Sequence, residues 1–255
     1  MLSADSTYLL AIGVLLAIAA AIIATPVVGA RRERISVLQY LIYLFGRTMA
    51  RWLWRAEVVG ALPVGAQCGA IIVCNHRSPF DPAFIQLAAG RVVHWMVARE
   101  YCMHPLFARL FRSVQAIPVG RAGIDTAATK LAIRYAQRGE LVGMFPEGRL
   151  NVSDHLLLSG RPGAALVALK ARAPVIPCYI SDSPMGATVY TSLFLPAKTR
   201  LVIGPLLDLS EYYGREKERD VLEALTKRLL HEIAQLAGHP EFEPSVAGRR
   251  GRPED

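Results

Sequence analysis

Short apolar runs alternate with longer amphipathic segments from Glu57 onward. Runs of this length, bounded by polar and turn-forming residues, are typical of buried strands. The predicted strands lie at 70–74, 92–98, 141–145, 175–180 and 199–204. Apolar residues at helical spacing predict helices at 82–89, 105–113, 124–138, 162–172 and 216–237. This alternation predicts an α/β domain over residues 57–240, with a mostly parallel central sheet flanked by helices.

An uncharged apolar stretch of 23 residues runs from Tyr8 to Ala30, and the basic segment "RRER" follows it. A helix of this length crosses a hydrocarbon core of about 30 Å. The stretch is longer than the apolar part of a signal peptide, and no Lys or Arg precedes it. We therefore predict that residues 1–34 form a single transmembrane anchor with a basic flank. By the positive-inside rule, the remainder of the chain is expected on the cytoplasmic side.

Residues 35–56 are mostly apolar and carry arginines at four-residue spacing, Arg47, Arg51 and Arg55. Residues four apart share one face of a helix, so the pattern predicts an amphipathic helix. A core helix with a solvated arginine face would give the same pattern. The position directly after the predicted anchor favours a helix lying at the membrane interface.

The composition agrees with a folded protein close to a membrane. Hydrophobic residues make up 53% of the chain, charged residues 20%, and the mean hydropathy is +0.30. The net charge of +8 suits an anionic partner: anionic lipid, nucleic acid or a phosphorylated substrate. Nucleic acid is disfavoured because the chain carries no recognition motif for it. The polar tail 241–255 is expected to be disordered.

The cysteines do not show the spacing of a metal site, and no metal ligand cluster is apparent. We expect them to be buried free thiols in a reducing compartment. They are Cys68, Cys74, Cys102 and Cys178.

The segment "NHRSPFD", residues 75–81, follows the predicted strand 70–74. A histidine at the exit of a buried strand can accept a proton from a hydroxyl, and a carboxylate can fix its tautomer and stabilise the imidazolium. His76 and Asp81 are therefore a candidate catalytic pair. Asp81 before Pro82 is also typical of a helix N-cap, and the two roles are compatible.

A second candidate site is "FPEGRL", residues 145–150, at the end of another predicted strand. The turn is expected to expose backbone amides beside Arg149, whose planar fork of donors suits a phosphate. Arg121 ends the run "IPVGR" and offers a second fork, and Arg161 is a third candidate. The alternative is a surface turn with solvated charges. Glu147 is expected to orient an arginine or a substrate hydroxyl rather than to touch phosphate.

Four blocks occur in order: "NHRSPFD", "AIPVGR", "FPEGRL" and "APVIPCYI", over residues 75–180. This arrangement resembles the glycerolipid acyltransferases of the lysophosphatidic acid acyltransferase type, over about residues 55–235. The resemblance implies an O-acyltransferase that moves a fatty acyl group from acyl-CoA or acyl-carrier protein to the hydroxyl of a lysophospholipid, most simply 1-acylglycerol-3-phosphate. Another lysolipid, glycerol 3-phosphate, or a non-catalytic lipid-binding role are the alternatives.

The resemblance also implies roles for individual residues. His76 matches the general base of the family and Asp81 its orienting carboxylate, without a covalent acyl-enzyme and without a cofactor or metal. Arg121, Glu147, Gly148 and Arg149 match residues linked to acceptor binding. The third block of the family commonly continues glycine, threonine, arginine, whereas here Arg149 follows Gly148 directly. The match of Arg149 is therefore shifted by one position.

Overall fold

The computed structural model describes residue 15 and residues 24–31, 36–65, 67–105, 107–120 and 125–247. The chain divides into two compact units, residues 1–47 and residues 48–255. Within the described ranges, no helix combines the length and the apolar character that crossing a bilayer requires. Most of the predicted anchor lies outside these ranges, so the anchor stays a prediction.

The predicted helix 35–56 is two elements rather than one. Helix α2, Val37–Thr48, starts with a reciprocal cap: Ser36 N–H donates to Gln39 Oε1 at 2.8 Å, and Gln39 N–H to Ser36 Oγ at 3.2 Å. A single π-helical turn, η1 (Met49–Leu53), follows it. The chain then leaves the helical conformation at Arg55, which has φ +39°. None of the α2 side chains is buried, whereas η1 contributes Ala50 to the core of the second unit.

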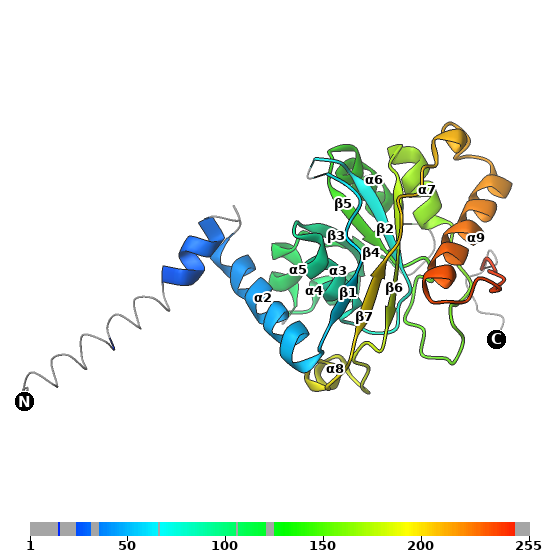
Figure 1. The fold of residues 1–255 in the computed structure, drawn as a ribbon. Coiled ribbons are helices and arrows are strands. Elements are labelled where there is room, and N and C mark those ends of the chain that lie inside the picture. The colour runs from blue at the N-terminus through cyan, green and yellow to red at the C-terminus, as the bar shows by residue number, and fades with distance from the viewer. Residues whose placement is uncertain are drawn as a thin grey trace, which may run out of the picture. The chain divides into compact units, whose positions relative to one another are not determined.

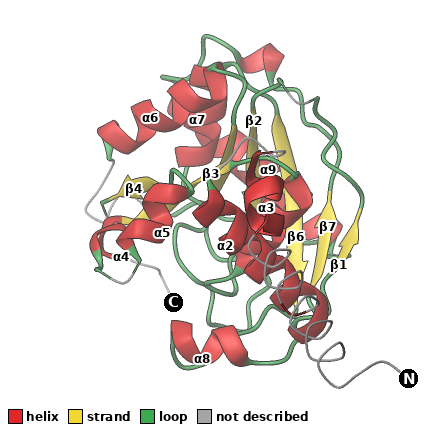
Figure 2. Cartoon of the chain, turned by 90° about the vertical axis from the view of Figure 1, so that its left-hand side faces the viewer, coloured by secondary structure: helices red, strands yellow, loops and turns green. Residues whose placement is uncertain are grey.

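The second unit is built around a seven-stranded sheet with the order β1-β7-β6-β2-β5-β3-β4 (Figure 1). The strands β6, β2, β5, β3 and β4 are parallel, β7 is antiparallel to β6, and β1 is parallel to β7. The mostly parallel sheet is thus confirmed. Figure 2 shows β1 and β4 at its opposite edges. The strand bounds are β1 Glu57–Val59, β2 Ala70–Cys74, β3 Val93–Ala98, β4 Ile117–Val119, β5 Leu141–Met144, β6 Val175–Ser181 and β7 Arg200–Ile203.

The helices of this unit cover both faces of the sheet and form the connections between strands. The sequence did not predict α4 and α8, and α5 is shorter than the helix expected at 105–113. The bounds are α3 Asp81–Ala89, α4 Arg99–Met103, α5 Ala108–Ser113, α6 Thr126–Gln137, α7 Gly163–Ala171, α8 Val189–Phe194, η2 Ser210–Tyr212 and α9 Arg219–Leu236.

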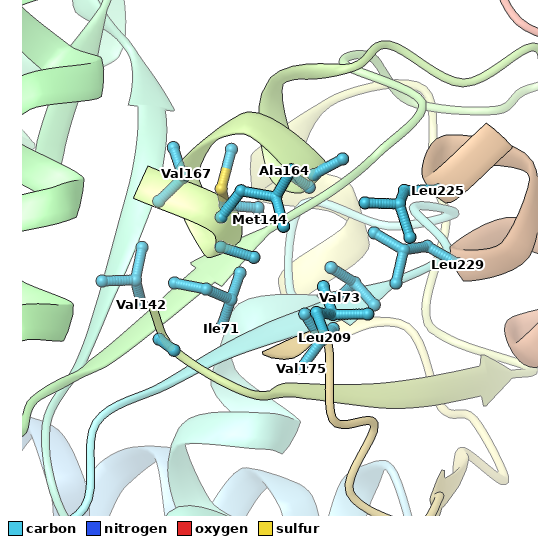
Figure 3. Packing of buried hydrophobic residues seen from close by; sticks show 14 of the residues in the cluster. Ile71, Val73, Val142, Met144, Ala164, Val167, Val175, Leu209, Leu225 and Leu229 are labelled. Atoms are coloured by element: carbon cyan, nitrogen blue, oxygen red, sulfur yellow. The ribbon is translucent and has the colours of Figure 1, made fainter. Parts of the chain in front are cut away.

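The alternation of side chains along β2 separates two hydrophobic clusters. Ile71 and Val73 face the cluster that α6, α7 and α9 cover, part of which is drawn in Figure 3. Ile72 and Cys74 face the other cluster, which includes Trp54 of the η1 segment and Phe84 of α3. Both faces of the sheet are covered at β2, so all five residues of this strand are buried. This explains why the whole strand is apolar. The central strands therefore hold their carboxyl ends in fixed positions.

One expectation about the cysteines needs correction. Cys74, Cys102 and Cys178 are buried free thiols, but Cys68 is exposed, because it lies in the turn before β2 rather than on the strand. Of the tail expected to be disordered, residues 241–247 are described and residues 248–255 lie outside the described residues, so that expectation stays a prediction. Gly160 N–H donates to Ser245 O at 2.9 Å, and Ala247 N–H donates to Gly160 O at 2.9 Å.

Candidate active site

The side chains of His76 and Asp81 meet just beyond the carboxyl end of β2. His76 Nδ1 lies 3.1 Å from Asp81 Oδ2, and the same oxygen accepts the backbone N–H groups of Arg77 and Ser78, both at 2.7 Å. The chain between them curls around the carboxylate. Asp81 is fully buried, whereas 18% of the His76 side chain is exposed. The structure thus brings together the predicted pair.

Asp81 does not cap α3, contrary to the alternative raised by its place before Pro82. It is the first residue of α3, the N-cap position falls on Phe80, and no side chain caps the helix. Its carboxylate turns back to the amides that precede it in the chain. The buried negative charge is therefore satisfied by the loop and by His76, and not by the helix end.

Ser183, on the segment after β6, binds the other oxygen of the carboxylate. Its hydroxyl donates to Asp81 Oδ1 at 2.6 Å. The neighbouring Pro184 accepts a 2.5 Å hydrogen bond from Ser78 Oγ. The serine is more than one hundred residues from the motif, and nothing in the sequence pointed to it. It fixes the plane of the carboxylate that faces His76.

The ring of His76 is held on one side by Phe145. The two rings are parallel, with an interplanar angle of 6° and centroids 3.7 Å apart, and Trp95 stacks on Phe145 in turn. With the Nδ1 proton directed at Asp81, the lone pair of the neutral ring is on Nε2. This arrangement presents one basic nitrogen in a fixed direction.

Glu147 holds the backbone of His76 in place through hydrogen bonds. Its Oε1 accepts the backbone N–H of His76 and its Oε2 that of Leu158, both at 2.8 Å. The side chain is 2% exposed, and burial raises the pKa of Glu147 to about 7, although the hydrogen bonds from Leu158 and His76 act to lower it. These contacts indicate a supporting role, and the part in acceptor binding that the resemblance implied for Glu147 stays a prediction.

The Pro146–Gly148 turn carries the exposed Arg149 and lies beside Arg161. Arg161 N–H donates to Pro146 O at 2.8 Å, and a Cβ atom at Gly148, which has φ +68°, would lie 2.8 Å from Arg161 Cδ. Glycine is needed there both for the left-handed conformation and for this close approach. Arg149 follows this turn, Arg161 lies beside it on the segment before α7, and both side chains are exposed. Arg121 lies outside the described residues.

Two asparagines complete the frame of the site. Asn75 opens the block "NHRSPFD", whereas no sequence pattern pointed to Asn151. The side-chain amide of Asn75 bonds both the N–H and the carbonyl of Ile180 at 2.8 Å, which joins the end of β2 to β6. Asn151 N–H donates to His76 O at 2.7 Å. The His76 backbone is thus held through its N–H by Glu147 and through its carbonyl by Asn151.

Other chemistries find little support near this site. Cys74 is close in sequence, but burial raises the pKa of its thiol well above the usual value, which keeps the thiol protonated. Within the part of the chain that the structure describes, there is no group of three or more His, Cys, Asp or Glu residues that could hold a metal ion.

The chain is similar in sequence to known acyltransferases. An acyltransferase family model matches residues 55–181. A 1-acyl-sn-glycerol-3-phosphate acyltransferase of Bacillus subtilis is 29% identical over 175 residues, which cover 67% of this chain and 82% of that protein. An uncharacterized protein of Mycobacterium leprae is 31% identical over 62% of this chain and 45% of its own length.

A solved structure extends the similarity from sequence to fold. The crystal structure of the 1-acyl-sn-glycerophosphate (LPA) acyltransferase PlsC from Thermotoga maritima superposes with a TM-score of 0.60. It is 25% identical, over 79% of this chain and 82% of that chain. The family resemblance predicted from the four sequence blocks is confirmed: the chain belongs to the acyltransferase family and is an O-acyltransferase.

Proposed function

We propose that this enzyme transfers a fatty acyl group from acyl-CoA or acyl-carrier protein to the free hydroxyl of 1-acylglycerol-3-phosphate, giving phosphatidate for phospholipid synthesis. The observation that carries the proposal is the pair His76 and Asp81, fixed at the carboxyl end of a central parallel strand. The relatives named as 1-acyl-sn-glycerol-3-phosphate acyltransferases support the choice of acceptor.

In the proposed mechanism, His76 acts as a general base. Nε2 takes the proton of the acceptor hydroxyl as its oxygen attacks the thioester carbonyl, and Asp81 stabilises the imidazolium through Nδ1–H. When the tetrahedral intermediate collapses, the C–S bond breaks and the proton passes from His76 to the leaving thiolate. The acyl group goes directly to the acceptor, so no acyl-enzyme forms and the protonated Cys74 has no part.

The phosphate of the acceptor is proposed to bind the guanidinium groups of the Pro146–Gly148 turn. Arg149 and Arg161 are exposed there, and the resemblance adds Arg121. Arginine suits this task because its donors pair with two phosphate oxygens at once. The order of residues after Gly148 differs from that of the family, so either Arg149 or Arg161 is the main contact.

We further propose that the enzyme is held at the cytoplasmic face of a membrane by an anchor within residues 1–34. The amphipathic α2 supports this placement, since Val37, Leu41 and Phe45 expose apolar side chains. An interfacial helix of this kind buries its apolar face among lipid headgroups and acyl chains. A membrane location would place the enzyme where its lipid acceptor resides.

The test is an acyl-transfer assay with membranes that carry the full chain, labelled acyl-CoA or acyl-carrier protein, and a panel of acceptors. The panel holds 1-acylglycerol-3-phosphate, glycerol 3-phosphate and lysophosphatidylcholine. We expect phosphatidate as the main product and a loss of roughly a hundredfold or more in His76→Ala, the scale of general-base removal. His239→Ala, which changes an exposed histidine paired with Glu241, is the matched control and is expected to keep full activity.

Each alternative gives a different result in this assay. Full turnover in His76→Ala would contradict the general-base mechanism. Acylation restricted to lysophosphatidylcholine would contradict the choice of acceptor. If none of the acceptors in the panel is acylated, a non-catalytic lipid-binding role would be favoured.

A further inference from the structure

Helix α8 buries Ser192 and Leu193 partly or fully against the unit and turns two aromatic side chains outward. Ser192 is fully buried; its hydroxyl donates to Thr188 O at 2.8 Å and accepts from Gly186 N–H at 2.9 Å. Thr188 and Thr191 form a capping box at the helix start. Tyr190 and Phe194, one turn apart, are 52% and 69% exposed. Leu193 packs against the core, so the helix is seated on the unit, and the two large exposed aromatic side chains beside it present a contact surface.

The exposed apolar residues continue on both sides of α8. The rings of Tyr190 and Phe107 are 6.0 Å apart between centroids, and Met103 ends the nearby α4 with 73% of its side chain exposed. On the other side, Met185 and Leu195 line a hollow of about 550 Å³. Figures 1 and 2 both place α8 beyond the end of the sheet. We call these residues the α8 surface: Met103, Phe107, Met185, Tyr190, Phe194 and Leu195.

Basic residues border this surface. Lys198 lines the hollow together with Leu195, and the exposed Arg109 and Arg112 follow Phe107 on α5. One carboxylate, Asp182, also lines the hollow. Apolar side chains bordered by lysine and arginine are complementary to a bilayer that contains anionic lipid, because the headgroups pair with the cations while the aromatic rings enter the interface.

The same surface adjoins the support of the catalytic pair. Ser183 lines the hollow, and its hydroxyl donates to Asp81 Oδ1. Asp81 is fully buried, so the hollow is separated from His76 by two hydrogen-bonded side chains. A contact at the α8 surface therefore lies next to the hydrogen bond that holds the catalytic carboxylate.

We propose that the α8 surface is a face on which the acyltransferase unit docks on a bilayer containing anionic lipid, in addition to any contact made by the N-terminal segment. The inference rests on the proposed function for the nature of the acceptor, and its first test does not require activity. The aromatic residues of α8 enter the interface, and the basic residues contact the headgroups.

The first test measures hydrogen exchange of the full chain, alone and with vesicles of equal parts phosphatidylcholine and phosphatidylglycerol. Peptide-level analysis separates α8 from the N-terminal segment. We expect slower amide exchange at residues 186–196 with these vesicles, and a smaller effect with pure phosphatidylcholine. Unchanged exchange of this segment on vesicle-bound protein would overturn the proposal. Slowing that appears without vesicles and rises with protein concentration would also overturn it, in favour of a second copy of the chain.

The second test compares acceptors with the double variant Tyr190→Ser/Phe194→Ser. We expect roughly tenfold slower turnover of a long-chain acceptor held in vesicles, and an unchanged rate with a short-chain, water-soluble acceptor. Leu206→Ser is the matched control, because Leu206 is also exposed but lies beyond the opposite end of β7. Equal loss with both acceptors would overturn the proposal.

The two proposals fail in different ways. If the wild-type chain does not acylate 1-acylglycerol-3-phosphate but residues 186–196 are protected by vesicles, the proposed function fails and the docking surface stands. If the acceptor is confirmed but vesicles neither protect α8 nor make turnover sensitive to the double variant, the docking surface fails alone.

Discussion

The backbone N–H of His76 donates a 2.8 Å hydrogen bond to Glu147 Oε1, which joins the first and third sequence blocks of the family. The carboxylate is buried and its second oxygen holds Leu158 N–H, so it braces the loops on both sides of the site. The block "FPEG" therefore has two duties. Its glutamate supports the histidine, and its glycine allows the close approach of Arg161.

Asp81→Asn is expected to remove catalysis through charge rather than through geometry. The amide oxygen can still accept from His76, Arg77 and Ser78, and the amide NH₂ can donate to Ser183, whose hydroxyl can reverse its role. Without the negative charge the imidazolium is not stabilised, and we expect turnover to fall by roughly 10²–10⁴. Rates and thermal unfolding of the pure protein would be measured together. A large fall in stability with a small fall in rate would contradict this role.

Ser183→Ala is expected to lower kcat about tenfold with little change in the acceptor KM. The hydroxyl makes a short hydrogen bond to a charged group, a contact that contributes roughly 1.5–3 kcal/mol. Its loss frees the carboxylate to rotate away from His76. Ser183→Thr keeps the hydroxyl and is expected to restore most of the rate. Steady-state kinetics decide the point, and a threonine variant as slow as the alanine variant would count against it.

The pKa of Glu147, raised to about 7 by burial, predicts how stability varies with pH. The folded protein holds this proton more tightly than the unfolded chain, whose carboxyl has an ordinary pKa of roughly 4.3. The stabilising contribution of Glu147 is therefore complete below that unfolded value and is lost as pH rises through about 7, by an amount on the order of 4 kcal/mol at most.

Glu147→Gln tests this dependence, because glutamine does not titrate. Its NH₂ must face one of the two backbone N–H groups, so the variant is expected to be less stable by about 1–3 kcal/mol at low pH. The difference in the free energy of unfolding between this variant and the wild type should become smaller as pH rises from roughly 4.3 to about 7. Denaturant unfolding at several pH values measures it. A constant difference would show that Glu147 keeps the same protonation in both states.

Gly148→Ala is expected to disturb the turn and the arginine beside it. The new Cβ would lie 2.8 Å from Arg161 Cδ, and φ is +68°, so we expect a loss of stability of about 1–2 kcal/mol and a higher KM for a phosphorylated acceptor. Gly65→Ala is the matched control, because a Cβ there would meet no atom within 4 Å. An unchanged KM would separate Arg161 from acceptor binding.

The sequence predicted most of the sheet because apolar runs identify strands that are buried on both faces. Ala70–Cys74 was predicted with its bounds, whereas the three-residue strands Glu57–Val59 and Ile117–Val119 are too short to give a periodic signal. Helix α8 was missed for a different reason. It has only six residues, and two of its apolar side chains, Tyr190 and Phe194, are exposed, so it lacks the pattern of a helix that packs on a core.

The sequence predicted the part of the candidate site whose residues are close together in the chain. The pair His76 and Asp81 could be inferred because five residues separate them. The structure shows that Asp81 turns away from the helix that its sequence suggested it caps. Ser183 could not be found from the sequence, because an isolated serine acquires meaning only when the sheet brings it to the carboxylate. For Glu147, the sequence indicated the position but not the burial that fixes its role.

Several hydrogen bonds around the site join residues that are far apart in the sequence, which has a consequence for how the enzyme folds. Hydrogen bonds join His76 to Glu147, Asn75 to Ile180 and Asp81 to Ser183, across sequence separations of 71, 105 and 102 residues. Such distant pairs form only after the loops between them have closed, which makes them late events in folding. During refolding, turnover should therefore return after helical structure does, and the regain of activity reports that β2, β5 and β6 have all joined.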